Sequence, residues 1–596
     1  MLDPLNFFLI ALVFLAAALF VTFILIKQFQ TVKKVEDKKR LEHLEIPYLL
    51  SEVKEMLLQL TSNRMDEFSG SKESYERELN KRALLRKALK NCNVGSLEDK
   101  RYIVELIADL LEKYLIQRDE ADQVLFFSKP KFLSAKDMFD ILIYRYQKEY
   151  EQLALEKLIT EEGWDQLQKT EYESLDTYTV TEAQVRKAYY QRIGILEERE
   201  KIEIIAQRIY ELYKGFGAVD CIRDMSIDGV SGGVSGLIDS DGGMDAKLLS
   251  EMKYIPHNYD SIWIFYKGKS IHLSFLSFES EKELRRVCQN IYRYNKAGQL
   301  SEDIGYKVNE MKDGSRVVVV RPPFSESWAF FVRKFHIQKL ELEELIQGEN
   351  CCFSIQLMKF LMKGGAITSV TGSQGSGKTT MLMALIKHIH PTLTLRVQEM
   401  AFELNLRKIY PYRNILTFKE TSAISGQAGL DLQKKTDGCV NILGEVATDE
   451  VSVLMLQMAQ VASLFTLFTH HAKTVDDLIL SLRNSLLKCN VFRDERIAEE
   501  QVIHVLDFDI HLNKNLEGKR YIERITEITK KENSETGKGK IILEYENGAY
   551  YPREEISKEK RVKLAKFMGE GERKEFYHFI AEYWGGVEDE FLATCS

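Results

Sequence analysis

The feature that most constrains this chain is a glycine-rich stretch with the sequence Gly372-Ser373-Gln374-Gly375-Ser376-Gly377-Lys378-Thr379. It matches the pattern GxxxxGK[ST] at every fixed position. In that pattern the glycines let backbone N–H groups close around phosphate oxygens, and the following helix presents the positive end of its dipole to them. We expect Lys378 to pair with the β and γ phosphates of ATP, and the Thr379 hydroxyl to coordinate Mg²⁺, with Thr380 beside it. A purely structural glycine turn is the alternative.

The residues around this motif predict a parallel α/β domain. Ile367 to Thr371 is β-branched and predicts a strand, and Thr380 to His390 carries apolar residues at helical spacing. A strand, a glycine loop, a helix and another strand, in that order, are typical of a mostly parallel sheet covered by helices. We therefore predict a RecA-like P-loop NTPase domain over residues 341–530.

Two acidic residues follow later strands of this domain. The predicted strand 393–398 ends at Glu399, and Glu403 would lie one helical turn later on the same face. The apolar run 440–443 ends just before Glu445, where a second carboxylate would meet the metal or the attacking water. Either glutamate alone could be an ordinary surface residue, but their order after the glycine loop favours a functional site.

A strand-like stretch from Leu464 to Thr469 places His470 and His471 at its end. A single histidine is more often structural than catalytic, so this pattern is weak by itself. It gains weight from following the glycine loop and both acidic positions.

The N-terminus predicts a membrane anchor. No charged residue occurs from Pro4 to Ile26, which is long enough to span a bilayer as a transmembrane helix over residues 5–26. A secretory signal is the alternative, but no basic residue precedes the apolar run and the run is long for a signal. Basic residues follow it, which would leave residues 1–4 outside and the body of the protein in the cytoplasm. We expect a single-pass protein of the cytoplasmic membrane.

The length of 596 residues suggests three or four structural units. Residues 27–200 are rich in Leu, Glu and Lys at helical spacing and predict an all-helical region, either a partner-binding bundle or a spacer. A small α+β domain is expected over residues 201–340, and a C-terminal strand and helical tail over residues 531–596. The net charge of -8 gives no general basic surface, so no nucleic acid is expected as a partner.

The α+β domain is predicted from a change in periodicity. Glycine is frequent between residues 215 and 243, and residues 231–236 predict a loop. The stretches 261–265, 271–275 and 316–320 then read as strands separated by glycine-containing turns.

Three further stretches, Gly215-Phe216-Gly217-Ala218-Val219, Asp313-Gly314-Ser315-Arg316-Val317 with Pro322-Pro323, and Arg333-Lys334-Phe335, agree with one known family in order and spacing. With the motifs above, the chain resembles the type II/IV secretion ATPase family over roughly residues 205–530. The resemblance is closest to the Flp/Tad pilus-assembly branch of the CpaF type.

The resemblance implies an ATPase that powers pilus assembly or protein secretion by nucleotide-driven domain motion. Glu399 would polarise water, Glu445 would belong to the Walker B segment and His471 to the histidine motif. Arg333 and Arg316 would approach the phosphates. Such ATPases form hexameric rings and act on an inner-membrane platform protein, so we expect a homo-hexamer and a partner of that kind.

The chain departs from the family at positions that usually carry arginine or histidine. Ala447, Gln433 and Lys435 replace arginines, and Ser463 replaces a histidine. Because arginine makes planar, bidentate phosphate contacts that these side chains cannot make, a second reading stays open. In that reading the chain binds nucleotide, hydrolyses it weakly and acts as a structural subunit. An ABC transporter ATPase is disfavoured because Gly444 stands where that class carries aspartate.

Overall fold

The computed structural model describes residues 43–62, 72–115, 120–169, 176–238, 256–296, 298–335, 341–421, 424–515, 518–529 and 539–585. The chain divides into two compact units, one ending at Lys334 and the other beginning at Phe335. The anchor predicted at residues 5–26 and the outer end at residues 1–4 lie outside the described residues. Within the described ranges, no helix combines the length and apolar character needed to cross a membrane.

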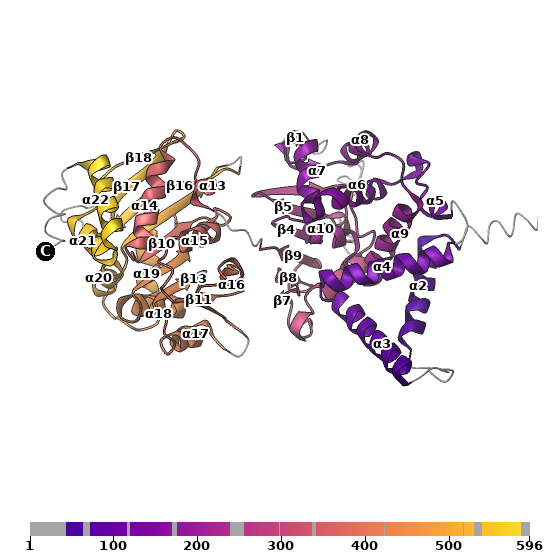
Figure 1. Ribbon diagram of the computed structural model, residues 1–596, viewed down its shortest axis with the longest axis horizontal. Helices are drawn as coiled ribbons and strands as arrows, with labels where there is room; N and C mark the ends of the chain where they lie inside the picture. Colours follow the sequence, from indigo (N-terminus) through magenta and orange to yellow (C-terminus); the bar gives the residue numbers. More distant parts are fainter. Residues whose placement is uncertain are drawn as a thin grey trace, which may run out of the picture. The chain divides into compact units, whose positions relative to one another are not determined.

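Unit 1 packs helices against a seven-stranded sheet with the order β3-β6-β5-β4-β9-β8-β7 (Figure 1). Neighbouring strands are antiparallel apart from β3 and β6. The strands are β3 Thr179–Val180, β4 Gly229–Gly232, β5 Ile262–Tyr266, β6 Lys269–Leu273, β7 Tyr306–Glu310, β8 Arg316–Val320 and β9 Ala329–Arg333. The helices are α2 Ile46–Thr61, α3 Lys72–Cys92, α4 Leu97–Tyr114, α5 Glu120–Leu125, α6 Ala135–Tyr150, α7 Ala154–Glu162, α8 Glu182–Arg192, α9 Glu198–Tyr213, α10 Asp220–Asp224 and α12 Glu281–Ile291.

The helices and the sheet of unit 1 share one core. Trp164, Phe216 and Phe330 are almost fully buried and belong to one continuous cluster of apolar side chains. The helical region expected at 27–200 and the α+β domain expected at 201–340 therefore form one compact unit. The first is also not all helical, because β3 joins the sheet and a small hairpin pairs β1 Gln168–Lys169 with β2 Asp176–Thr177.

The loop predicted at residues 231–236 is wrong at its start, because Gly229–Gly232 form β4 in the middle of the sheet. A Cβ atom at Gly232 would lie 2.6 Å from the Phe330 ring, and one at Gly229 would lie 2.4 Å from the Val332 carbonyl oxygen. The glycines here let neighbouring strands and aromatic rings approach closely, rather than forming a turn.

Unit 2 is built on a nine-stranded sheet with the order β12-β11-β13-β14-β10-β15-β16-β17-β18 (Figure 1). The strands are β10 Thr368–Gly372, β11 Leu395–Glu399, β12 Ile415–Lys419, β13 Val440–Leu443, β14 Phe465–His470, β15 Phe508–Lys514, β16 Arg520–Ile528, β17 Gly539–Glu546 and β18 Ala549–Pro552. The helices are α13 Leu342–Leu345, α14 Cys351–Lys363, α15 Lys378–Ile386, α16 Leu406–Ile409, α17 Gly426–Gln433, α18 Asp449–Gln457, α19 Val475–Lys488, α20 Glu495–Val505, α21 Lys558–Phe567 and α22 Glu570–Trp584.

The six strands from β12 to β15 are parallel, and β16, β17 and β18 continue the sheet in antiparallel fashion. The described residues after 530 belong to the same sheet and core. Phe353 of α14 stacks on Phe579 of α22 with ring centroids 5.5 Å apart, and both rings are buried. The C-terminal strands and helices are thus part of the α/β unit and not a separate tail.

Candidate active site

The glycine-rich loop connects β10 to α15 at the carboxyl ends of the parallel strands. Gly372 has φ +139°, and a Cβ atom there would lie 2.2 Å from the carbonyl oxygen of Leu512 on β15. Gly377 has φ +96° and is the N-cap residue of α15. Because only glycine adopts such φ values without strain, both positions require it, and the loop has the backbone that a phosphate cradle needs.

Lys378 lies inside this loop and is only 8% exposed. Its ammonium donates to the carbonyl oxygens of Gly372 and Ser373 at 3.0 and 2.9 Å, and lies 3.2 Å from Nδ1 of His471. An ammonium group can only donate, so Nδ1 of His471 accepts and the ring carries its proton on Nε2. Nε2 lies 3.1 Å from Oε1 of Glu445. The three side chains therefore form one continuous row of polar contacts.

This chain of contacts joins three strand ends, with Lys378 after β10, His471 after β14 and Glu445 after β13. The Glu445 side chain is 37% exposed and the His471 side chain 50% exposed. The contacts therefore lead from the buried lysine to solvent. A group bound in the loop would meet a cation, an imidazole and a carboxylate side by side.

Glu399 lies at the end of β11, and β13 and β14 separate that strand from β10. At about 4.8 Å per strand spacing, the two strands are roughly 14 Å apart. Glu399 is 5% exposed, and its Oε1 accepts from the backbone N–H groups of Glu403 and Leu404 at 2.9 and 2.8 Å. Glu399 thus orders the segment that follows it. The helical turn expected to carry Glu403 is absent, since the described residues 400–405 are irregular.

Glu399 also packs under the turn that carries Glu445. A Cβ atom at Gly444 would lie 3.2 Å from Cγ of Glu399, so a side chain there would force Glu399 to move by a few tenths of an ångström. The structure therefore brings Glu445 to the loop lysine through His471, and brings Glu399 only to the base of the Glu445 turn.

His470 faces away from this chain of contacts. Its Nδ1 lies 2.8 Å from the carbonyl oxygen of Val446 and its Nε2 lies 3.0 Å from the Ser481 hydroxyl. Burial lowers the pKa of His470, so the ring is neutral, donates from Nδ1 and accepts at Nε2. This histidine holds the strand ends together.

The oxygen atoms needed for Mg²⁺ are also present. Thr379 and Thr380 are half-buried in the first turn of α15, and Ser373, Gln374 and Gly375 are exposed on the loop. A threonine hydroxyl and the Glu445 carboxylate are the oxygen ligands that Mg²⁺ prefers, with phosphate and water completing the shell. No cluster of three or more His, Cys, Asp or Glu side chains suited to a metal occurs among the described residues.

The two arginines expected at the phosphates lie in unit 1. Arg316 on β8 and Arg333 on β9 are directly opposite each other in the antiparallel register, so their side chains share one face of the sheet. Arg333 is exposed and Arg316 half-buried. Glu310 of β7 lies opposite Arg316 on the same row.

A polar network beneath the loop was not anticipated from the sequence. Asp509 on β15 is fully buried and accepts from the hydroxyl groups of Ser369 and Thr371 on β10 at 2.7 and 2.9 Å. The Thr371 hydroxyl also lies 2.8 Å from Nδ1 of His511. Burial raises the pKa of Asp509 to about 6 and lowers that of His511 to about 4. Polar residues that alternate along two adjacent buried strands were the available signal.

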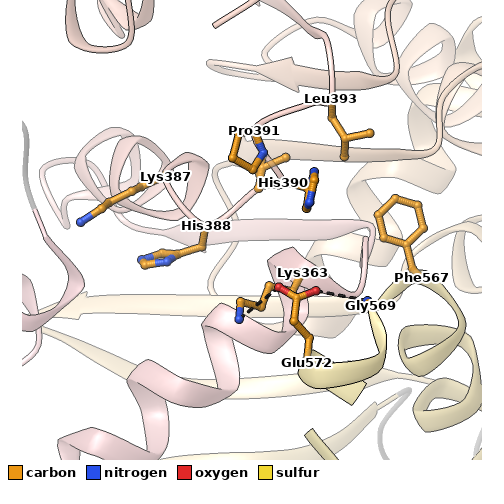
Figure 2. A pocket seen from close by; sticks show the side chains of 10 residues that line it. Lys363, Lys387, His388, His390, Pro391, Leu393, Phe567, Gly569 and Glu572 are labelled. Atoms are coloured by element: carbon orange, nitrogen blue, oxygen red, sulfur yellow. Dashed lines mark hydrogen bonds and ion pairs between the residues drawn. The ribbon is translucent and has the colours of Figure 1, made fainter. Parts of the chain in front are cut away.

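A cavity of about 450 Å³ lies at the opposite end of α15 (Figure 2). It is lined by the residues that follow this helix, His388 and His390 among them, and by Lys363 and Glu572, which form an ion pair at 3.2 Å. A helix of this length separates it from Lys378 by about 13 Å. The cavity is therefore distinct from the loop that carries the chemistry.

Comparisons with known proteins give weak similarities. No family model matches the chain, and no curated protein matches it. Among solved structures it is similar to the VirB11 ATPase of the Brucella suis type IV secretion system (16% identity, 45% of this chain and 89% of that one, TM-score 0.27). It is also similar to the ATPase DotB of Legionella pneumophila (16%, 46% and 75%, 0.34) and to the pilus retraction motor PilT with bound ADP (13%, 60% and 86%, 0.36). At these identities and TM-scores, the similarity assigns neither an activity nor a family to the chain.

Proposed function

We propose that the chain is an ATPase anchored in the cytoplasmic membrane through residues 5–26, which powers pilus assembly or type II/IV protein secretion. The observation that carries the proposal is the row of polar contacts from Lys378 through His471 to Glu445, next to a loop with the backbone of a phosphate cradle. The proposal includes a homo-hexameric ring of the CpaF type, an inner-membrane platform protein as partner, and Arg316 and Arg333 as phosphate contacts.

Lys378 would leave its three acceptors and bind the β- and γ-phosphate oxygens of ATP. The loop N–H groups and the start of α15 would hold the same oxygens. Thr379 and Glu445 would hold Mg²⁺, directly or through water, and this ion supplies charge neutralisation at the transferred phosphoryl group.

Glu445 is the carboxylate best placed to orient the attacking water and to accept its proton. Water would attack the γ-phosphorus, the bond to the β-phosphate oxygen would break, and ADP would leave with that oxygen. His471 would hold Glu445 in place, and Glu399 would support the turn from below through its contact with Gly444.

Steady-state ATP turnover of the full chain in detergent or lipid tests this proposal. Wild type should release phosphate, whereas Lys378→Ala should lose nucleotide binding and Glu445→Gln should bind ATP and turn it over slowly. If all three proteins release phosphate at the same low rate, the enzyme proposal fails.

A weakly hydrolysing structural subunit is the second candidate, and the surroundings of Gln433 favour it. Gln433 is buried, and its amide donates to Oε1 of Gln398 at 3.3 Å. It is a packing residue at a position where the resembling family carries arginine, and Ala447 nearby is exposed and has no polar group. Tight binding of ATP by the wild-type chain with no measurable turnover would support this candidate.

A further inference from the structure

Arg520, the first residue of β16, reaches the phosphate loop from the side. Its guanidinium Nε donates to the carbonyl oxygen of Gly375 at 3.0 Å. Its Cδ would lie 3.3 Å from a Cβ atom at Gly377, so the aliphatic part of the side chain covers the outer surface of the loop. Sequence motifs gave no reason to single out this arginine, which lies 140 residues or more from the loop in sequence.

The sheet explains how Arg520 comes to this place. β15 lies beside β10, and β16 pairs with β15 in antiparallel register, with Arg520 opposite Lys514. Asn515 and Lys519 link the end of β15 to the start of β16. The backbone N–H of Asn515 donates to the carbonyl oxygen of Lys519, and the Asn515 side chain accepts from the Lys519 N–H at 2.8 Å. Gly372, where the loop begins, pairs with Leu512 of β15, so the loop starts one strand away from β16.

The peptide that Arg520 binds is connected to Lys378. In a trans peptide, a Gly375 carbonyl that points outward directs the N–H of Ser376 inward. That N–H lies 3.3 Å from the carbonyl oxygen of Ser373, which also accepts from the Lys378 ammonium at 2.9 Å. The direction of one peptide plane therefore sets the acceptor that positions the loop lysine.

We infer that Arg520 is a positioning residue of the nucleotide site: it binds the outer side of the phosphate loop and fixes the peptide geometry on which Lys378 depends. The inference rests on the proposed nucleotide site. Arg520 acts on the loop, and the loop binds the phosphates that ADP and ATP share. Its loss should weaken the binding of both nucleotides.

The test compares affinities for ADP and ATP in the full-length protein with Arg520→Ala, Arg520→Lys and Lys519→Ala. Loss of one charge-assisted hydrogen bond costs about tenfold in affinity, so we expect Kd for both nucleotides to rise by about tenfold in Arg520→Ala. Arg520→Lys keeps a cationic donor and should recover most of this loss. Lys519→Ala removes an exposed neighbouring charge without the loop contact and should bind within about twofold of wild type.

The outcomes separate the inference from the function on which it rests. A loss of ATP affinity alone, or unchanged Kd values in Arg520→Ala, would overturn the positioning role while leaving the nucleotide site in place. If the wild-type protein binds neither nucleotide, as is expected of Lys378→Ala, both the positioning role and the proposed nucleotide site are overturned.

Discussion

Nζ of Lys378 lies 3.2 Å from Nδ1 of His471, so the loop lysine and the histidine after β14 are bound to each other. Lysine has two further acceptors, the carbonyl oxygens of Gly372 and Ser373. All three contacts compete with phosphate for the same ammonium group. His471 therefore has two expected roles: it competes with phosphate for Lys378, and it orients Glu445 during turnover.

The double role predicts opposite effects of His471→Ala on binding and on rate. Removing this acceptor frees the Lys378 ammonium from one competing hydrogen bond, so Kd for ATP should fall by about threefold, the effect of an ordinary hydrogen bond. Turnover should fall, because Glu445 loses the partner that orients it. Isothermal titration and phosphate release measure the two effects. Ser481→Ala, which removes the partner of His470, is the control and should change neither. Weaker ATP binding in His471→Ala would contradict the competition between imidazole and phosphate.

Glu445→Gln tests the role of the carboxylate. Glutamine keeps the size of the side chain and can still accept from Nε2 of His471, so the fold and ATP affinity should be preserved. It cannot accept a proton from water, and turnover should fall about 100-fold or more. Single-turnover phosphate release after binding of labelled ATP measures the chemical step. Glu399→Gln is the comparison, and a larger loss of rate in that variant would move the catalytic base to β11.

The parallel part of the fold could be predicted from the sequence, because its signals are local. The strand expected at 367–371 is β10 at Thr368–Gly372, and the helix after the glycine motif is α15. β4 could not be predicted from its own sequence. Its glycines are required because the Phe330 ring and the Val332 carbonyl oxygen, on a strand distant in the sequence, leave no room for a side chain. The place of β17 and β18 in the main sheet likewise depends on long-range pairing that no short pattern contains.

The site could be predicted only as a set of strand ends. Which strand ends are adjacent depends on the strand order, and β14 and β13 lie between β10 and β11. This order puts His471 and Glu445 near Lys378 and puts Glu399 farther away. The contact of Arg520 with Gly375 needs two more neighbouring strands, and the Asp509 network needs the register of β10 against β15. None of these relationships is encoded within one segment.

The buried carboxyl group of Asp509 predicts a pH dependence of stability. Burial raises its pKa from 3.8 to about 6, so the folded state holds the proton more tightly than the unfolded state. The stability contributed by the protonated carboxyl group is complete below pH 3.8 and is lost as the pH rises through 6.

Asp509→Asn should remove this dependence. The free energy of unfolding of the variant, relative to wild type, should rise by about 3 kcal/mol between pH 4 and pH 7, because each pKa unit corresponds to about 1.4 kcal/mol. Urea unfolding at several pH values measures it. Asp437→Asn, at an exposed carboxylate, should give a difference that does not vary with pH. The same flat result for Asp509→Asn would show that the buried group stays ionised across this range.

We expect substitution of Lys100 to lower the stability of unit 1 strongly. Its ammonium lies between Asp220, at 2.5 Å, and Asp224, and Asp220 is 1% exposed. Lys100→Met leaves the buried Asp220 carboxylate without this cation, while Asp224 keeps Arg223 at 2.7 Å. The substitution should lower the free energy of unfolding by about 3–5 kcal/mol. Lys148→Met removes a lysine that is 49% exposed and pairs with Glu200, and it should cost under about 1 kcal/mol.

A second substitution distinguishes lost charge balance from lost packing at Lys100. Asp220→Asn removes the carboxylate charge that is left without Lys100, so the double variant Lys100→Met/Asp220→Asn should be more stable than Lys100→Met alone. If the double variant is less stable by the sum of the two single effects, the ion pair is not the source of the stability.

We expect substitution of Arg333 or Arg316 to lower activity without a large loss of stability. Arg333 is exposed, so Arg333→Ala should change the free energy of unfolding of unit 1 by less than about 1 kcal/mol. If the guanidinium contacts phosphate during turnover, as proposed, kcat should fall by about tenfold or more, since such arginines stabilise the charge of the transferred phosphoryl group. Thermal unfolding and phosphate release, measured on the same preparation, separate the two effects. Arg293→Ala, at an exposed arginine of the same unit, should alter neither. Full activity in Arg333→Ala and in Arg316→Ala would remove both arginines from the nucleotide site.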